Sequence, residues 1–107
     1  MVASKYIIIL ITAPIQDASA IAKHLIERHV AACVNIIPEV RSIYYWKNEI
    51  CDDKEALLIV KTESILFERL KEEVRFIHSY EVPEIIALPI AEGYKPYLNW
   101  ISQVVKA

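Results

Sequence analysis

The sequence predicts an α+β sandwich with the element order β-α-β-β-α-β, followed by one further helix. Three observations carry this prediction. Residues 6–13 are apolar at odd and even positions alike, which is typical of a strand covered on both faces. Two later segments repeat apolar residues at i, i+3, i+4 and i+7, the spacing of an amphipathic helix. Residues 32–61 form a long strand pattern that only a short turn interrupts, which indicates a hairpin.

Length and composition limit the class of protein. The 107 residues fit one domain, spanning 1–107, and the net charge of −2 offers no basic stripe for nucleic acid. No run approaches the ~20 apolar residues that a membrane-spanning helix needs. The chain is 55% hydrophobic, and a chain this small buries only part of its surface. We therefore expect a homo-oligomer whose subunits cover one another's apolar patches.

The N-terminal apolar run has a second interpretation. Lys5, the run at 6–13 and the small residues Ala18-Ser19-Ala20 imitate the three parts of a secretory signal peptide. The run is short, however, and Pro14 follows it directly. We interpret it as a strand.

The first helix is predicted from a one-sided apolar pattern. It begins near Asp17 as N-cap and ends around Arg28–His29, and its apolar face comprises Ala18, Ile21, Ala22, Leu25 and Ile26. His24 and His29 lie about 140° apart around this helix, so they cannot share a metal ion, and we expect both at the surface.

The hairpin follows at 32–46 and 50–61. Pro38 interrupts its first strand, and because proline is confined to strand edges and bulges, it marks a bend. The turn lies at Lys47-Asn48-Glu49, where Asn48 is the residue best able to adopt a positive φ. The hairpin is long enough to project beyond a small core and contact a neighbouring subunit.

The second helix carries Leu66, Leu70, Val74 and Ile77 on its apolar face. Arg69 and Glu73 supply opposite charges at i,i+4 on the solvent side, as do Glu72 and Arg75 at i,i+3. Pro83 then forces a change to extended backbone, and a buried strand follows at 85–90. Pro96 starts the last helix, whose apolar stripe is Tyr97, Trp100, Ile101 and Val104.

Two right-handed β-α-β crossovers place both main helices on one face of a four-stranded antiparallel sheet. The predicted fold is therefore a ferredoxin-like sandwich with an added C-terminal helix.

The corner at 78–84 holds the densest group of ligand-capable side chains in the sequence, among them His78, Tyr80 and Glu81. One imidazole nitrogen with carboxylate oxygens suits Cu(II), Ni(II) or Zn(II). Such a shell is incomplete, so other ligands would come from water or a second subunit. In the alternative interpretation, His78 caps the helix C-terminus and Glu81 faces solvent.

The two cysteines also allow two interpretations. Cys33 is either a small buried hydrophobe or a thiolate ligand for copper, which favours soft sulfur. Cys51 lies near the hairpin tip and, if the strands pair about Asn48, near Tyr45. That places it ~40 Å from Cys33 along the strand, which excludes an intramolecular disulfide.

A ligand cleft is a further expectation. Tyr80, Lys61 and Trp46 are its candidate residues: Lys61 could meet an anion or the Glu81 carboxylate, and the hairpin aromatics could stack on a ligand. The alternatives are a surface lysine and aromatic side chains that pack across strands or between subunits. The sequence contains no Gly-x-Ser-x-Gly motif and one glycine in all, so we expect no nucleophilic enzyme.

Several blocks of sequence, in register, resemble the CutA family. They are Leu25 to Ile36, the aromatic hairpin Ser42 to Ile50, Leu57 to Thr62, His78 to Ile90, and Tyr97-Leu98-Asn99-Trp100. The resemblance implies a ferredoxin-like homotrimer, related in build to the PII signalling proteins, that is cytoplasmic and takes part in divalent-cation tolerance. It also implies copper binding, as in some bacterial members. The family usually has proline where this chain has Ser79, which should loosen the helix exit but leaves His78, Tyr80 and Glu81 in place.

Three functions follow as hypotheses. The first is a homotrimer that weakly binds a divalent metal ion, Cu(II) above all, through His78 and Glu81, with Cys33 as a further donor. The second is a PII-like sensor of a small anionic metabolite that binds through Lys61 and the aromatic side chains. The third is a stable structural trimer with adventitious metal binding.

Overall fold

The computed structural model describes residues 4–107, and residues 1–3 of the expected domain 1–107 lie outside the described residues. The predicted element order is confirmed, with two short 3-10 helices added before the main helices. The elements are β1 (Tyr6–Ala13), η1 (Ile15–Asp17), α1 (Ala18–Glu27), β2 (Cys33–Trp46), β3 (Glu49–Glu63), η2 (Ser64–Leu66), α2 (Phe67–Ile77), β4 (Ile85–Pro89) and α3 (Lys95–Val104).

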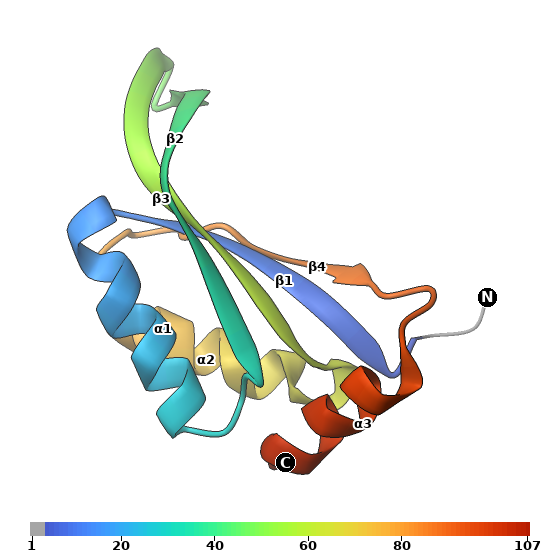
Figure 1. Cartoon of the computed structure of the whole chain (residues 1–107). Helices are drawn as coiled ribbons and strands as arrows, with labels where there is room; N and C mark the ends of the chain where they lie inside the picture. The colour runs from blue at the N-terminus through green and yellow to red at the C-terminus, as the bar shows by residue number, and fades with distance from the viewer. Residues whose placement is uncertain (1–3) are drawn as a thin grey trace.

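The strands form one antiparallel sheet in the order β2-β3-β1-β4. Helices α1 and α2 lie side by side against one face of this sheet, and α3 lies at one end of it (Figure 1). This arrangement confirms the predicted ferredoxin-like sandwich with its added helix. None of the helices within residues 4–107 has the length and apolar character needed to cross a membrane.

The core lies between the sheet and the two long helices. In β1 the odd-numbered residues Ile9 and Ile11 are fully buried, and on the neighbouring β3 the same face carries Leu58 and Val60. These side chains pack against the apolar stripes of the helices, which are Ile21 and Leu25 of α1 with Leu70 and Val74 of α2. The two central strands, β1 and β3, therefore bury one face of the sheet within a single chain.

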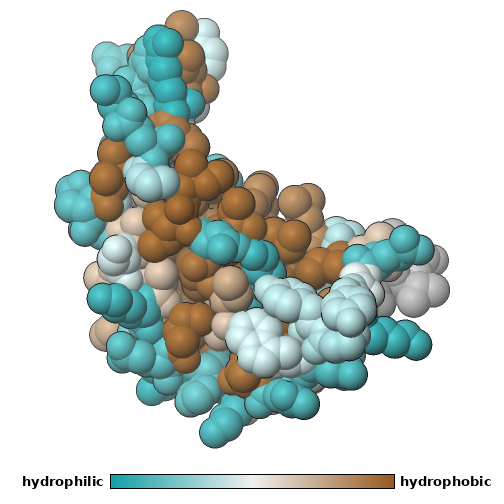
Figure 2. All heavy atoms as spheres, in the orientation of Figure 1, coloured by the Kyte–Doolittle hydropathy of each residue, from teal (hydrophilic) through white to brown (hydrophobic). Residues whose placement is uncertain are grey.

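Among residues 4–107, no helix lies over the centre of the opposite face of the sheet (Figure 1). We call it the open sheet face, and its apolar residues are Ile8, Leu10, Leu57, Ile59, Ile86 and Leu88. Ile86 and Leu88 of the edge strand β4 are about half exposed. Figure 2 shows apolar surface that continues from the projecting hairpin down onto the body of the molecule. Uncovered apolar surface of this kind is typical of interaction sites.

The β2–β3 hairpin projects well beyond the rest of the molecule, as predicted (Figure 1). Its pairing register shifts between Ile37 and Val40, which confirms the bend at Pro38. Lys47 and Asn48 form a two-residue turn, and both have positive φ, 52° and 65°. This is the conformation that matches the right-handed twist of hairpin strands. The positive φ predicted for Asn48 is confirmed, and Lys47 shares it.

The third helix closes a second, smaller cluster of buried residues at one end of the sheet. Ile101 is fully buried there, with Ala32 and Leu66 as neighbours. The predicted apolar stripe of this helix is only partly buried, because Tyr97 and Trp100 remain 41% and 37% exposed. Their exposed faces lie outside the core of a single chain.

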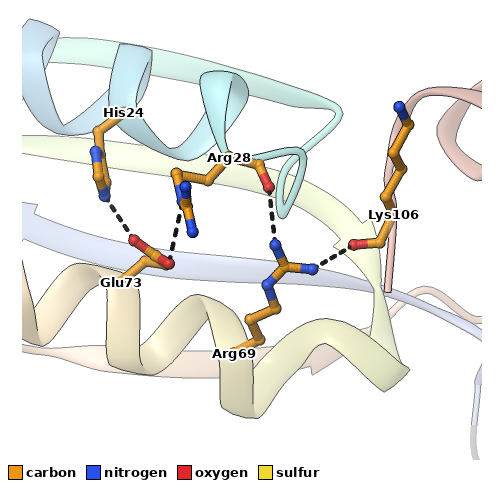
Figure 3. Close-up of polar contacts among 5 residues, drawn as sticks. All are labelled: His24, Arg28, Arg69, Glu73 and Lys106. Atoms are coloured by element: carbon orange, nitrogen blue, oxygen red, sulfur yellow. Dashed lines mark hydrogen bonds and ion pairs between the residues drawn. The ribbon is translucent and has the colours of Figure 1, made fainter.

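A set of polar contacts joins α1, α2 and the C-terminal tail (Figure 3). Glu73 accepts hydrogen bonds from His24 Nε2 at 2.7 Å and from Arg28 Nε at 3.3 Å. Arg69 donates to the carbonyl oxygens of Lys106 and Arg28. The predicted ion pair between Arg69 and Glu73 is therefore wrong, because each side chain finds a partner on another element. His24 likewise bridges two helices, although a surface position was expected.

Glu73→Gln is expected to lower stability by about 0.5–1 kcal/mol at neutral pH. The hydrogen bond from His24 holds the pKa of Glu73 below its ordinary value, with Arg28 acting in the same direction. A depressed pKa means that the stabilisation is present above the unfolded-state value and is lost as the pH falls through the lowered folded-state value.

Urea unfolding at a series of acidic pH values tests this expectation. The variant should lose less stability than the parent as the pH falls, since it lacks the carboxylate. Glu68→Gln is the matched control, because Glu68 lies on the same helix but its side chain is 75% exposed. If the parent and Glu73→Gln lost stability equally as the pH fell, the result would contradict the role given to Glu73.

Candidate cation-binding cleft

The corner between α2 and β4 is organised by His78. Its backbone N–H donates to Val74 O at 2.8 Å, and its own backbone is extended, so α2 ends here. His78 as a residue is buried, with 8% of its surface exposed. Its Nε2 lies 2.7 Å from the carbonyl oxygen of Thr12 in β1, and its Nδ1 lies 3.1 Å from the backbone nitrogen of Tyr80.

These two contacts assign the protons of the ring. Nε2 donates to a carbonyl, so it carries the hydrogen, while Nδ1 accepts from the Tyr80 N–H. Both nitrogens of this neutral tautomer are therefore used by the protein. His78 lies at the C-terminal cap position of α2, as the alternative interpretation expected. Its imidazole ring, however, contacts Thr12 of β1 rather than the end of α2. A metal ion would have to displace one of the two hydrogen bonds.

Next to this corner lies a cleft of about 600 Å³. It lies between the end of β1, the outer half of the hairpin and the loop before β4. Its lining residues are Thr12, Ser42, Ile43, Tyr44, Trp46, Glu55, Tyr80, Glu81, Val82 and Glu84. Three of the sequence-predicted residues, Trp46, Tyr80 and Glu81, line this one cleft. Three carboxylates line it, and none of the described residues in the lining is Lys, Arg or His.

Glu55 is the most buried acid of the cleft, with 6% of its surface exposed. It lies on β3 two residues before Leu57, on the same face of the sheet. The Tyr80 hydroxyl donates to Glu55 Oε1 at 2.7 Å. Burial, together with this hydrogen bond and the negative charge, raises the pKa of Tyr80. Tyr80 is therefore a hydrogen-bond donor in the cleft and cannot supply a phenolate to a metal ion near neutral pH.

Two further groups in the cleft respond to the local negative charge. Burial, and then repulsion from Glu55, raise the pKa of Glu84. The Tyr44 hydroxyl donates to Asp53 Oδ2 at 2.5 Å, and this bond, followed by burial, raises the pKa of Tyr44 to about 12. Both phenols that line the cleft thus donate to carboxylates. The cleft concentrates negative charge, which favours a positively charged ligand.

Lys61 and Cys33 lie elsewhere. They are cross-strand partners, and Lys61 donates a hydrogen bond to Asn35. Lys61 is six residues from Glu55 on β3, or ~20 Å along the strand. The expected meeting of Lys61 with Glu81 in the cleft is therefore wrong, because Lys61 lies at the other end of the strand.

Cys33 and His78 are also separated. The ring of His78 binds Thr12, which pairs with Leu57, whereas Cys33 pairs with Lys61, ~13 Å further along β3. One metal ion cannot bridge them within a chain. Cys33 is half-buried rather than fully buried, and both cysteines are free, as the separation along the hairpin predicted. Within residues 4–107, no group of three His, Cys, Asp or Glu side chains is close enough to hold a metal ion alone.

Sequence reasoning missed Glu55 and did not single out Glu84. A signal for Glu55 was present in the hairpin. It follows the strand's polar half and directly precedes the apolar run at 56–60, so the alternation of the strand gives it the same face as Leu57 and Ile59. A carboxylate that lies beside Leu57 and Ile59 on one sheet face and is buried there is a candidate functional group.

The fold and the cleft define a class of small ferredoxin-like proteins with an acidic, aromatic site beside a long hairpin. The profile of the CutA1 divalent ion tolerance protein family matches residues 7–104. The chain belongs to this family.

The chain is 52% identical over 97 residues to the divalent-cation tolerance protein CutA of Thermus thermophilus, covering 90% of this chain and 94% of the relative. It covers only 51% and 50% of the mouse and human CutA proteins. Among solved structures, CutA1 of the psychrotrophic bacterium Shewanella sp. superposes with a TM-score of 0.94 at 37% identity, covering 99% of this chain and 100% of the other. A periplasmic divalent cation tolerance protein CutA from Archaeoglobus fulgidus gives 0.91 at 42% identity, covering 94% and 99%.

Proposed function

We propose that this chain binds a divalent cation in the acidic cleft and serves in cellular tolerance of such ions. One observation carries the proposal: Glu55, Glu81 and Glu84 line a single cleft whose lining includes no Lys, Arg or His. Carboxylate oxygens are ligands for divalent ions, and water or a second subunit would complete the shell. The function is binding rather than catalysis.

Copper is the metal we propose first. Cu(II) binds nitrogen and oxygen ligands more tightly than the other common divalent ions, but it favours an imidazole over carboxylates alone. His78 becomes a ligand if Nδ1 gives up its hydrogen bond from Tyr80, which costs about 1 kcal/mol. Micromolar binding supplies about 8 kcal/mol, so this cost does not prevent coordination. Cys33 is proposed only as a thiolate ligand of a separate copper ion at the other end of the strand.

Calorimetric titration of the chelator-treated protein with Cu(II) and Zn(II) tests the cleft. Glu55→Gln keeps the shape of the side chain and an acceptor for Tyr80 but removes the charge, so affinity should fall at least tenfold, about 1.4 kcal/mol. Glu81→Gln should act in the same direction, and His78→Ala should weaken Cu(II) binding. Glu92→Gln, an exposed acid outside the cleft lining, is the matched control. Binding that survives unchanged in Glu55→Gln, Glu81→Gln and His78→Ala would refute the proposed site.

A PII-like sensor of an anionic metabolite is less well supported. The carboxylates of the cleft would repel an anion, and Lys61, the expected cation, lies ~20 Å away along β3. We therefore retain cation binding as the function that the site supports best.

We also propose that the chain assembles as a homotrimer. The open sheet face offers a largely apolar surface, and the projecting hairpin carries Tyr45 and Ile50, which are 74% and 68% exposed. Large apolar side chains at these positions are favourable only when another subunit covers them. A second copy of the same chain carries the same apolar surface and can cover it.

We propose a cytoplasmic location, supported by two free cysteines, which persist in a reducing compartment. The Archaeoglobus fulgidus relative is described as periplasmic, so the compartment is a separate question from the fold. Fractionation of cells, followed by immunodetection, distinguishes the two; recovery in the periplasm would contradict the proposal.

A further inference from the structure

The cleft has a second chemical character that a bare metal ion does not use. Tyr44, Trp46 and Tyr80 line it together with the carboxylates. Its volume of about 600 Å³ is within the range of clefts that hold small organic molecules. Aromatic faces attract cations that carry alkyl groups, because the negative face of the ring meets a poorly hydrated charge. The wall of the cleft is therefore suited to an organic cation.

The hydrogen-bonding groups of the cleft point to the same class of ligand. Tyr80 donates to Glu55 Oε1, and Tyr44 donates to Asp53, so both phenolic protons are already used. Within residues 4–107 no hydrogen bond is found to the second oxygen of Glu55, although the residue is 6% exposed. The groups of the cleft that remain available to a ligand are hydrogen-bond acceptors and aromatic faces. A carboxylate oxygen that has no such partner and is open to the cleft favours a charged N–H donor.

We propose that this cleft binds a small organic ammonium ion, such as a protonated alkyl diamine. The ammonium group donates to Glu55, and its methylene chain lies against Trp46 and Tyr80. A second ammonium group meets Glu81 or Glu84 at the mouth. The inference rests on the shape and lining of the cleft and does not depend on metal binding.

Titration of the chelator-treated, full-length protein with butane-1,4-diamine tests the proposal. Calorimetry and tryptophan fluorescence both report the outcome. The chain contains two tryptophans, so a Trp100→Phe background isolates the emission of Trp46. The diamine should bind saturably at millimolar concentration or below and change the Trp46 emission. Butanedioate, an anion of the same length, should not bind.

Two variants probe the two walls separately. Glu55→Gln should weaken diamine binding at least tenfold, because it removes the charge that pairs with the ammonium group. Trp46→Leu should weaken it about two- to fivefold through loss of the cation–aromatic contact. Trp100→Leu is the matched control, since Trp100 lies on α3 outside the cleft lining and should leave the affinity unchanged.

Tetramethylammonium tests the need for N–H donors. It carries the same type of charge but cannot donate to Glu55, so it should bind several-fold more weakly than the diamine. Absence of saturable diamine binding would overturn the proposal, as would equal binding of butanedioate or affinity unchanged in both Glu55→Gln and Trp46→Leu. Because no metal ion is present in these titrations, this failure would be distinct from a failure of Cu(II) or Zn(II) to bind.

Discussion

Ile86→Glu is expected to convert the proposed trimer into single chains. Ile86 lies on the edge strand β4, opposite Leu10, and half of its surface is exposed in one chain. A glutamate there remains hydrated in the isolated subunit, so the fold should tolerate it. In the assembly the same carboxylate would be buried against apolar side chains at a cost of several kcal/mol, repeated at each interface. Sedimentation or light scattering should show the mass of one chain.

Phe76→Glu is the matched control for this substitution. It also replaces a large apolar side chain with the same acid, but Phe76 lies on α2 and is 86% exposed. The helix layer lies on the other face of the sheet (Figure 1), so the mass should stay that of the parent assembly. An unchanged mass in Ile86→Glu, or equal dissociation in both variants, would contradict the open sheet face as the subunit interface.

The fold could be predicted because local signals agreed with one another. The run at 6–13, apolar at both parities, specified a central strand, and Pro83 specified the change from α2 to β4. The hairpin followed from its length, its turn residues and the bend at Pro38. Each signal acts within a few residues, so the sequence determines it without knowledge of the packing. The positive φ of Asn48 is another feature that local sequence determines.

Partner choice among long side chains could not be predicted in this way. Arg69 and Glu73 have ideal helical spacing for an ion pair. In the structure, however, Arg69 donates to backbone carbonyl oxygens and Glu73 accepts from His24 of α1 (Figure 3). An i,i+4 pair is worth only about 0.2–0.5 kcal/mol, and tertiary contacts of similar or greater value outweigh it. The same limit applies to Lys61, whose position depends on the direction of β3 and its pairing with β2.

The site was predicted in part for a related reason. Glu81, Tyr80 and Trp46 were recognised by their residue types, and all three line the cleft. Glu55 is more distant in sequence and reaches them only because β3 runs past the corner at the end of α2. His78 was recognised as a ligand type, but the hydrogen bond from its Nε2 depends on the closeness of Thr12. Sequence identifies candidate groups, whereas the topology decides which of them converge.

Leu58→Ala and Leu57→Ala form a matched pair that separates folding of the subunit from assembly. The two leucines are adjacent on β3 and face opposite sides of the sheet, Leu58 toward the helices and Leu57 on the open sheet face. Leu58 is fully buried within one chain, so its truncation should cost about 2–5 kcal/mol through lost burial and the remaining cavity.

Denaturant unfolding at several protein concentrations measures the difference. Leu58→Ala should lower the midpoint by a similar amount at every concentration, because the loss lies inside the subunit. Leu57→Ala should lower it through association, so its effect should depend on protein concentration. Equal, concentration-independent losses in both variants would mean that Leu57 contributes to the subunit core and that the open sheet face is not a shared interface. A loss confined to assembly would place the subunit boundary along the plane of the sheet, with the long helices on the outside of the proposed trimer.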